Sequence, residues 1–218
     1  MNLSRCPSNR QQANLLARYR FYLPFVTALS CISIVNYSFF SWTPALLQRQ
    51  FGFSITDSGW AFGGALLILG PVSMAMAGIA VDRVRRLRAE VAALRIAAAG
   101  GLVAVPFALL LTLGDSTFSA LLGIAGVVFF ISLSPTLGPF VVQITTPNNY
   151  RGFAISLYLL ILNVIGLGLG PSIAAGIADG FTIGLGPSIA IVSVVMLPLA
   201  ALLFRLAWKR VDAIGTGS

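Results

Sequence analysis

The chain has 218 residues, of which 57% are hydrophobic and only 9% are charged, and its net charge is +8. A typical soluble domain carries roughly 25% charged residues, so this composition excludes an ordinary water-soluble fold. The basic residues stand at the ends of apolar runs and not on one polar face. That distribution argues against nucleic-acid binding and favours a protein embedded in a lipid bilayer.

Apolar runs of the length that a bilayer requires predict an all-α fold of six transmembrane helices. We expect a polar cytoplasmic leader or linker over residues 1–20, a six-span bundle over 21–208 and a cytoplasmic tail over 209–218. The expected spans are about 21–47, 58–81, 92–113, 118–144, 153–178 and 187–204. Pro135 and Pro139 are expected to interrupt the fourth span and to free backbone carbonyls, so that this span lines a cavity.

Small residues indicate where the helices approach one another closely. Gly59 and Gly63 have the spacing of a close helix contact, and Gly166, Gly170 and Pro171 follow one another along the fifth span. The glycine run from Gly166 to Gly170 lies within a span and follows no strand, so helix packing explains it better than a dinucleotide site.

The charged residues predict the orientation of the bundle. Every Lys and Arg except Arg49 lies in the leader, the second loop, the fourth loop or the tail, or within the adjoining ends of the spans. Because cytoplasmic loops are enriched in Lys and Arg, we expect both termini in the cytoplasm. The expected location is a bacterial inner (plasma) membrane. The first three and the last three spans then have opposite topologies, as a 3+3 inverted repeat requires. All acidic residues fall in loops or at span ends, so any coupling carboxylate must come from another chain.

Candidates for catalysis or metal binding are lacking in the sequence. It contains no histidine and no Gly-x-Ser-x-Gly motif, and its two cysteines, Cys6 and Cys31, do not have a metal-binding spacing. We therefore expect no enzymatic activity, no metal and no cofactor.

The loop after the second span holds a carboxylate, Asp82, at the unfavourable end of a helix dipole. Arg83, Arg85 and Arg86 can offset this cost, and these residues alone are also compatible with a simple anchoring loop. The motif Gly78-x-x-x-Asp82-Arg83-x-Arg85-Arg86 resembles the loop motif of the major facilitator superfamily, with Arg85 at the position of a usual glycine. The segments Tyr37–Arg49 and Arg151–Asp179 are similar to the seventh and eleventh spans of spinster-like members.

This resemblance implies that the chain is the C-terminal half of a twelve-span carrier. It also implies a conformational gate in which Asp82 pairs with Arg83 and Arg86 and approaches the fifth span near Arg151, with Gly78 and Arg85 completing the loop motif. Such a gate would hold the cytoplasmic side closed in the outward-facing state.

Polar residues within the spans are candidates for a substrate cavity: Ser33, Asn36, Tyr37, Ser134, Tyr158 and Asn163. The alternative is that they form interhelical hydrogen bonds, which contribute about 0.6 kcal/mol each in membranes. Their weak polarity favours an amphipathic or neutral organic solute.

The leading hypothesis is a secondary-active transporter of a small organic solute, present as a six-span half. Because alternating access requires two bundles, the partner would be a second six-span half or, in a parallel homodimer, a second copy. The alternative is a truncated or non-transporting subunit that assembles with or regulates other membrane chains.

Overall fold

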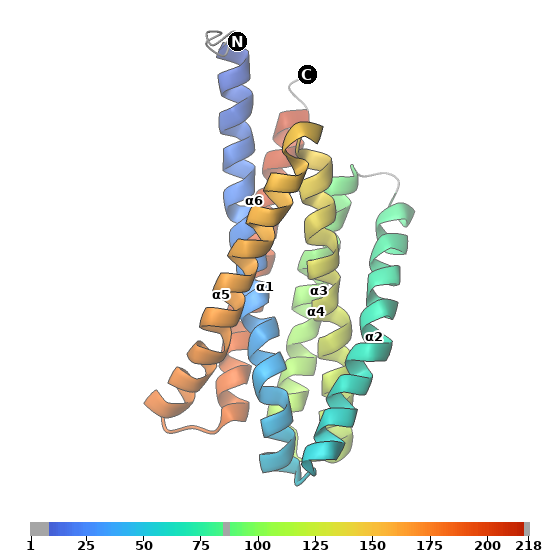
Figure 1. The fold of residues 1–218 in the computed structure, drawn as a ribbon, viewed down its shortest axis with the longest axis vertical. Helices are drawn as coiled ribbons and strands as arrows, with labels where there is room; N and C mark the ends of the chain where they lie inside the picture. Colours follow the sequence, from blue (N-terminus) through green and yellow to red (C-terminus); the bar gives the residue numbers. More distant parts are fainter. Residues whose placement is uncertain (1–8, 85–87, 216–218) are drawn as a thin grey trace.

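The computed structural model describes the backbone of residues 9–84 and 88–215 and the side chains of residues 21–84 and 88–210. Within this part of the chain there are six α-helices and one short 3-10 turn, and no β-strand (Figure 1). The elements are α1 Asn9–Phe51, α2 Ile55–Arg83, α3 Ala89–Leu113, α4 Thr117–Thr145, η1 Asn148–Tyr150, α5 Arg151–Gly180 and α6 Leu185–Gly215. All six helices are long and apolar enough to span a membrane, which confirms the predicted all-α membrane fold.

The first helix is longer at both ends than the sequence predicted. It begins at Asn9, inside the expected leader, because residues 9–20 contain no Gly or Pro and are rich in the helix formers Gln, Leu, Ala and Arg. It continues through Pro44 and ends at Phe51, and the next residue, Gly52, has a φ of +68° that favours glycine. The side chain of Ser54 then caps α2 by accepting a hydrogen bond from the Asp57 backbone N–H at 3.0 Å.

The fourth helix corrects a prediction. Pro135 and Pro139 do not interrupt it, because α4 is helical from Thr117 to Thr145. Each proline removes only one N–H donor, and a chain surrounded by lipid has no water with which to replace the remaining helical hydrogen bonds. The two prolines thus leave the carbonyls of Ile131 and Pro135 without their usual helical donors but do not end the helix.

The packing of the helices follows a twofold pattern. Helix α1 packs against α5 and α6, helix α4 packs against α2 and α3, and α3 packs against α6. Exchanging α1 with α4, α2 with α5 and α3 with α6 leaves this set of pairs unchanged. The bundle therefore has the helix pairing of a 3+3 inverted repeat.

The connections separate the charges between the two ends of the bundle. The start of α1, the end of α2, the start of α3, the α4–α5 turn and the end of α6 lie at one end, which is the top in Figure 1. This end carries Arg83, Arg88 and Arg151, whereas Arg49 lies at the opposite end with the α1–α2 turn.

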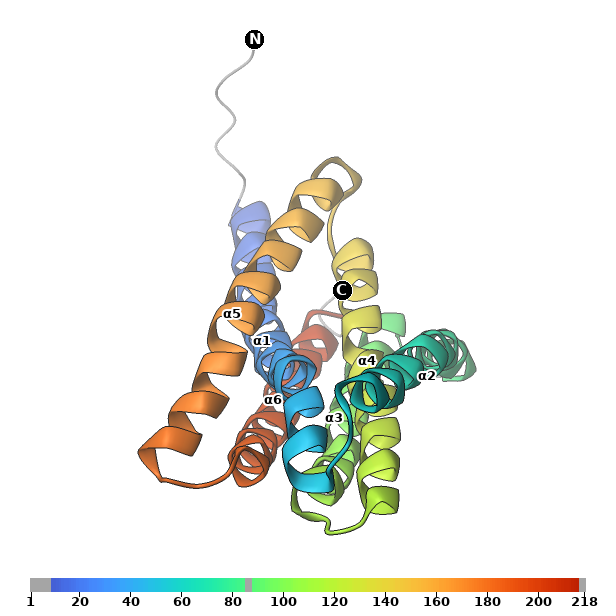
Figure 2. The ribbon, with the colours of Figure 1, turned by 60° about the horizontal axis from the view of Figure 1, so that its bottom comes forward.

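The core lies between α1, α3, α4 and α6. In the most hydrophobic 18-residue segments of α1 and α4, 61% and 56% of the residues are buried, but in those of α2 and α5 only 11% and 17% are buried. Large side chains such as Phe25, Ile124 and Phe204 fill the interior. Helices α2 and α5 therefore flank the bundle and leave most of their surface uncovered, as the view in Figure 2 illustrates.

Candidate functional site

The uncovered surface of α1 includes a row of polar side chains. Exposed or half-buried polar side chains recur along this helix at steps of six, four and four residues, at Thr27, Ser33, Tyr37 and Ser41, with Asn36 beside Tyr37. The buried side of the helix is largely apolar but also holds Ser30, Ser38 and Thr43, and Leu23 and Phe40 are exposed on the same helix. In a membrane helix the exposed side is normally apolar, so a row of uncovered polar side chains is unusual for a helix that faces lipid.

Helix α4 also has uncovered polar side chains, beside exposed apolar ones such as Phe118, Leu121 and Ile144. Ser132, Thr136 and Gln143 are half-buried or exposed, and the Thr136 hydroxyl donates to the Ser132 carbonyl oxygen at 3.0 Å. These three residues are not among the predicted cavity residues. Their spacing of four and seven residues, which places them on one side of a helix, is the signal that could have found them. We call the uncovered polar residues of α1 and α4 (Thr27, Ser33, Asn36, Tyr37, Ser41, Ser132, Thr136 and Gln143) the polar face.

The exposed surfaces of α3 and α6 are different. They consist largely of apolar side chains, including Leu102, Val103, Val194, Val195 and Leu199. Such side chains need no partner in lipid, whereas polar groups transferred to hydrocarbon without hydrogen bonds are costly. The bundle therefore has one surface suited to lipid and one that requires water or another protein.

Four of the predicted cavity residues come together on or beside the polar face. The Tyr37 hydroxyl of α1 donates to Asn163 Oδ1 of α5 at 2.5 Å, and Asn163 Nδ2 donates to the Leu159 carbonyl oxygen at 2.8 Å. Ser33 and Asn36 are half-buried on the same helix as Tyr37. This cluster joins α1 to α5, and Asn163 remains exposed.

The other two predicted cavity residues, Ser134 and Tyr158, lie away from the polar face. Both are buried, and neither hydroxyl has a hydrogen-bond partner in the described part of the chain. The Tyr158 hydroxyl lies against Gly138 of α4, where a methyl group built on the glycine would overlap it. A buried polar group without a partner costs about 1–3 kcal/mol.

We expect Tyr158→Phe to stabilise the chain by about 1 kcal/mol, because the substitution removes an unpaired hydroxyl and keeps the ring. Thermal unfolding in detergent measures the effect as a higher Tm. Tyr22→Phe is the matched control and should lower Tm, since the Tyr22 hydroxyl makes hydrogen bonds of 2.8 and 2.7 Å to Thr145 and Thr146. A lower Tm for Tyr158→Phe would contradict the assignment of an unpaired hydroxyl.

The glycines of α5 bring it close to α1. A Cβ atom on Gly166 would lie 2.5 Å from Tyr37 Cδ2, and one on Gly170 would lie 2.7 Å from the Ile34 carbonyl oxygen. The Ser38 hydroxyl is 2.7 Å from the Gly170 carbonyl oxygen, and Trp42 Nε1 donates to the Pro171 carbonyl oxygen at 3.1 Å. This contact fixes the position of the Tyr37–Asn163 cluster.

The other predicted glycine contact is not made within the described part of the chain. A Cβ on Gly59 or Gly63 would meet no described atom within 4 Å, and both residues are exposed on α2. The predicted close approach at these two glycines would therefore require another molecule.

The predicted contacts of the gate are not seen among the residues that the structure describes. Gly78, Asp82 and Arg83 are exposed near the end of α2, whereas Arg85 and Arg86 lie outside the described residues. The structure shows no ion pair to Asp82 among the residues it describes; Arg88 pairs with Glu90 at 2.7 Å. Arg151 Nε instead donates to the Thr146 carbonyl oxygen at 3.2 Å, across the α4–α5 turn. The predicted approach of Asp82 to Arg151 stays a prediction for another conformation.

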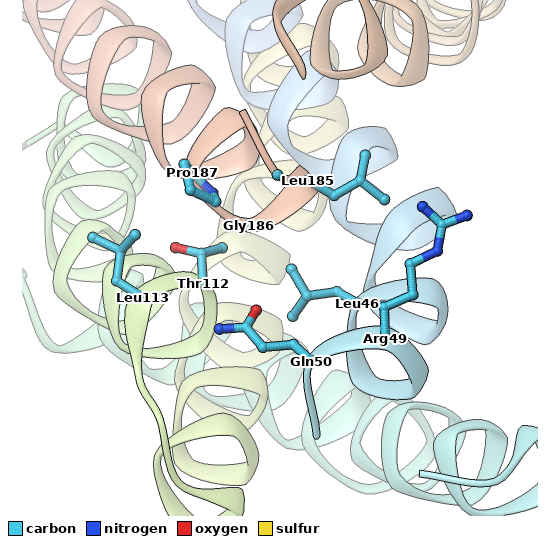
Figure 3. Close-up of a pocket in the computed structure, with 9 residues that line it drawn as sticks. Leu46, Arg49, Gln50, Thr112, Leu113, Leu185, Gly186 and Pro187 are labelled. Atoms are coloured by element: carbon cyan, nitrogen blue, oxygen red, sulfur yellow. The ribbon is translucent and has the colours of Figure 1, made fainter. Parts of the chain in front are cut away.

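Two cavities lie at opposite ends of the bundle. One, of about 510 Å³, is formed by the ends of α1 and α3 and the start of α6, and includes Arg49, Gln50 and Thr112 (Figure 3). The other, of about 550 Å³, lies between the first part of α1, the end of α4 and the start of α5. The described residues contain no group of three or more His, Cys, Asp or Glu side chains that could hold a metal ion.

Comparison with known proteins identifies a family for this arrangement. The sequence matches the family model of the Major Facilitator Superfamily over residues 7–171. A solved bacterial homolog to the human lysosomal transporter Spinster, in an inward-facing and unoccupied conformation, is similar with a TM-score of 0.68 and 19% identity over 95% of this chain and 52% of that chain. A second structure of such a bacterial homolog, in an inward-facing and occupied conformation, is similar with a TM-score of 0.63 and 19% identity over 87% of this chain and 49% of that chain. The chain thus spans about half the length of these solved chains, and the comparison with curated proteins found no match.

Proposed function

Because the chain belongs to the Major Facilitator Superfamily, we propose that it forms one half of a secondary-active transporter for a small organic solute. The observation that carries this proposal is the polar face. Two helices related by the inverted repeat, α1 and α4, both direct polar side chains outward at positions where a lipid-facing helix would be apolar. Water and solute in a transport pathway would satisfy these groups.

A second bundle is needed to enclose that pathway. The flanking helices α2 and α5 are the least buried, so a partner can cover the polar face by packing along both of them. The partner is a second six-span half or, in a parallel homodimer, a second copy of this chain. No carboxylate lies on the polar face in the described residues, so the partner would also supply any group that couples transport to protons or ions.

The charge distribution supports an orientation in the bilayer. We place the end that carries Arg83, Arg88 and Arg151 in the cytoplasm, because short cytoplasmic loops are enriched in Lys and Arg. The start of α1 and the end of α6 then both lie on the cytoplasmic side. We place the chain in the plasma membrane of a bacterium. In this orientation the separation of Asp82 from Arg151 corresponds to an open cytoplasmic gate.

Uptake by vesicles containing the purified chain tests the proposal. We expect radiolabelled uncharged solutes from a panel of sugars, nucleosides and aromatic alcohols to include one that accumulates above protein-free vesicles. Tyr37→Phe should then reduce uptake roughly tenfold, because it breaks the hydrogen bond that positions Asn163 on the pathway. Tyr150→Phe, which changes an exposed tyrosine outside the polar face, is the control. Equal uptake by the Tyr37 variant would contradict the pathway. No uptake of any solute would contradict a transporter formed by two copies of this chain, and leave a separate second half or a non-transporting subunit.

A further inference from the structure

A group of basic side chains lies on α3 and α6, the two helices whose exposed surface is otherwise apolar. These helices pack against each other. Helix α3 contributes Arg95 and α6 contributes Arg205 and Lys209, and all three side chains are exposed. The apolar span of α6 extends to Arg210, so these charges lie near the level of the lipid headgroups. We call Arg95, Arg205, Lys209 and the half-buried Trp208 the basic patch.

A contact between the two helices holds Arg95 in place. Its guanidinium carbon lies 5.4 Å from the centroid of the Trp208 ring, which is a cation–π distance. Such a contact requires no hydrogen-bond acceptor, and no hydrogen bond or ion pair of Arg95 is seen among the described residues. The guanidinium N–H donors are therefore available to an anion outside the bundle.

The two cations of α6 lie beside this contact. Arg205 precedes Trp208 by three residues and Lys209 by four, so the three side chains are neighbours on one side of the helix. Neither cation forms an ion pair with a described carboxylate, and Glu90 of α3 already has an arginine partner at 2.7 Å. The side chain of Asp212, farther along α6, lies outside the described residues. The described part of the patch thus carries positive charge that no described carboxylate neutralises.

Apolar surface adjoins the basic patch on the side of the membrane interior. On α6, Leu202 and Leu206 are 58% and 48% exposed next to Arg205. On α3, Ala99 and Leu102 are exposed at steps of four and three residues after Arg95, so they continue its side of the helix. A molecule with an anionic head and apolar chains matches both parts of this surface, whereas a free anion matches only the patch.

We propose that the basic patch binds the phosphodiester headgroup of an anionic phospholipid whose acyl chains lie along α3 and α6. Arginine guanidinium groups donate charge-assisted hydrogen bonds to phosphate oxygens, and basic sites between transmembrane helices at the cytoplasmic surface suit anionic headgroups. A zwitterionic lipid is a poorer ligand, because its own cation is repelled by the three positive charges. The site does not depend on the proposed transport, since α3 and α6 lie outside the polar face.

Quenching of Trp208 fluorescence by brominated lipids tests this site. The full chain, with Trp42 and Trp60 replaced by Phe, is reconstituted in phosphatidylcholine vesicles. The vesicles contain increasing shares of phosphatidylglycerol brominated near the headgroup end of its acyl chains, or of phosphatidylcholine brominated at the same carbons. We expect the brominated phosphatidylglycerol to quench Trp208 at lower shares than the brominated phosphatidylcholine.

Arg205→Gln should reduce this preference about fivefold, the size expected for one cation near the membrane surface. Arg83→Gln is the matched control, because it removes the same charge from the same end of the bundle on α2 and should leave the preference unchanged. Thermal unfolding of each variant confirms that it is folded.

Three outcomes would overturn the proposal: equal quenching by the two lipids, equal effects of Arg205→Gln and Arg83→Gln, or release of the brominated phosphatidylglycerol by inorganic phosphate at constant ionic strength. The second would indicate a general effect of charge, and the third a site for a free anion. A preference that depends on Arg205 and persists in phosphate supports the lipid site whether or not the chain takes up a solute.

Discussion

Replacing Gly170 with Leu is expected to lower the Tm of the chain in detergent by roughly 10 °C. A Cβ at this position would already lie 2.7 Å from the Ile34 carbonyl oxygen and 3.2 Å from Tyr37 Cβ, and backbone cannot rotate away as a flexible side chain can. Overpacking of a fixed contact costs about 3 kcal/mol. The substitution also displaces the Gly170 carbonyl from the Ser38 hydroxyl.

Gly168→Leu is the matched control for this experiment. It places the same side chain two residues away on the same helix, where a Cβ would meet nothing within 4 Å and the residue is exposed. Its Tm should stay within about 3 °C of the wild type, because a surface substitution typically changes stability by less than about 0.5 kcal/mol and removing a helical glycine is favourable. Equal losses at Gly168 and Gly170 would contradict the close packing of α1 against α5.

Much of the fold could be predicted because the bilayer imposes the length and composition of each helix. The spans, their order and the clustering of arginines around Asp82 all follow from this constraint. The errors concern helix ends and breaks. The start of α1 at Asn9 depends on ordinary helix propensity outside the membrane, and the continuity of α4 through Pro135 and Pro139 depends on the cost of unpaired backbone in lipid.

The candidate site could be predicted only in part, because polarity alone does not say which way a side chain points. Tyr37 and Asn163 were selected as polar residues of two spans, and the structure joins them. Ser134 was selected for the same reason, yet it lies on the buried side of α4, while Ser132 and Thr136 lie on the uncovered side. Two residues along a helix correspond to a rotation of about 200°, so the choice depends on how α4 is rotated against α2 and α3.

The second prediction concerns water access to the two surfaces of the bundle. The experiment starts from a chain in which Cys6 and Cys31 are replaced by Ala. Single cysteines are then introduced on the polar face, at Ser33 or Thr136, and on the apolar surface, at Val103 or Val194. Thiols react as thiolates, which form in water and are strongly disfavoured in hydrocarbon. Cysteines on the polar face should therefore react on the order of 100-fold faster with a charged, membrane-impermeant methanethiosulfonate, if a water-filled pathway covers them.

This labelling experiment tests the central claim most directly. It uses native membrane vesicles that are opened so that the reagent has access from both sides. We predict rapid modification at Ser33 and Thr136 and slow modification at Val103 and Val194, and the same order of rates at saturating concentrations of the reagent. Equal rates at the four positions, or faster reaction on α3 and α6 than on α1 and α4, would contradict a polar pathway along this face.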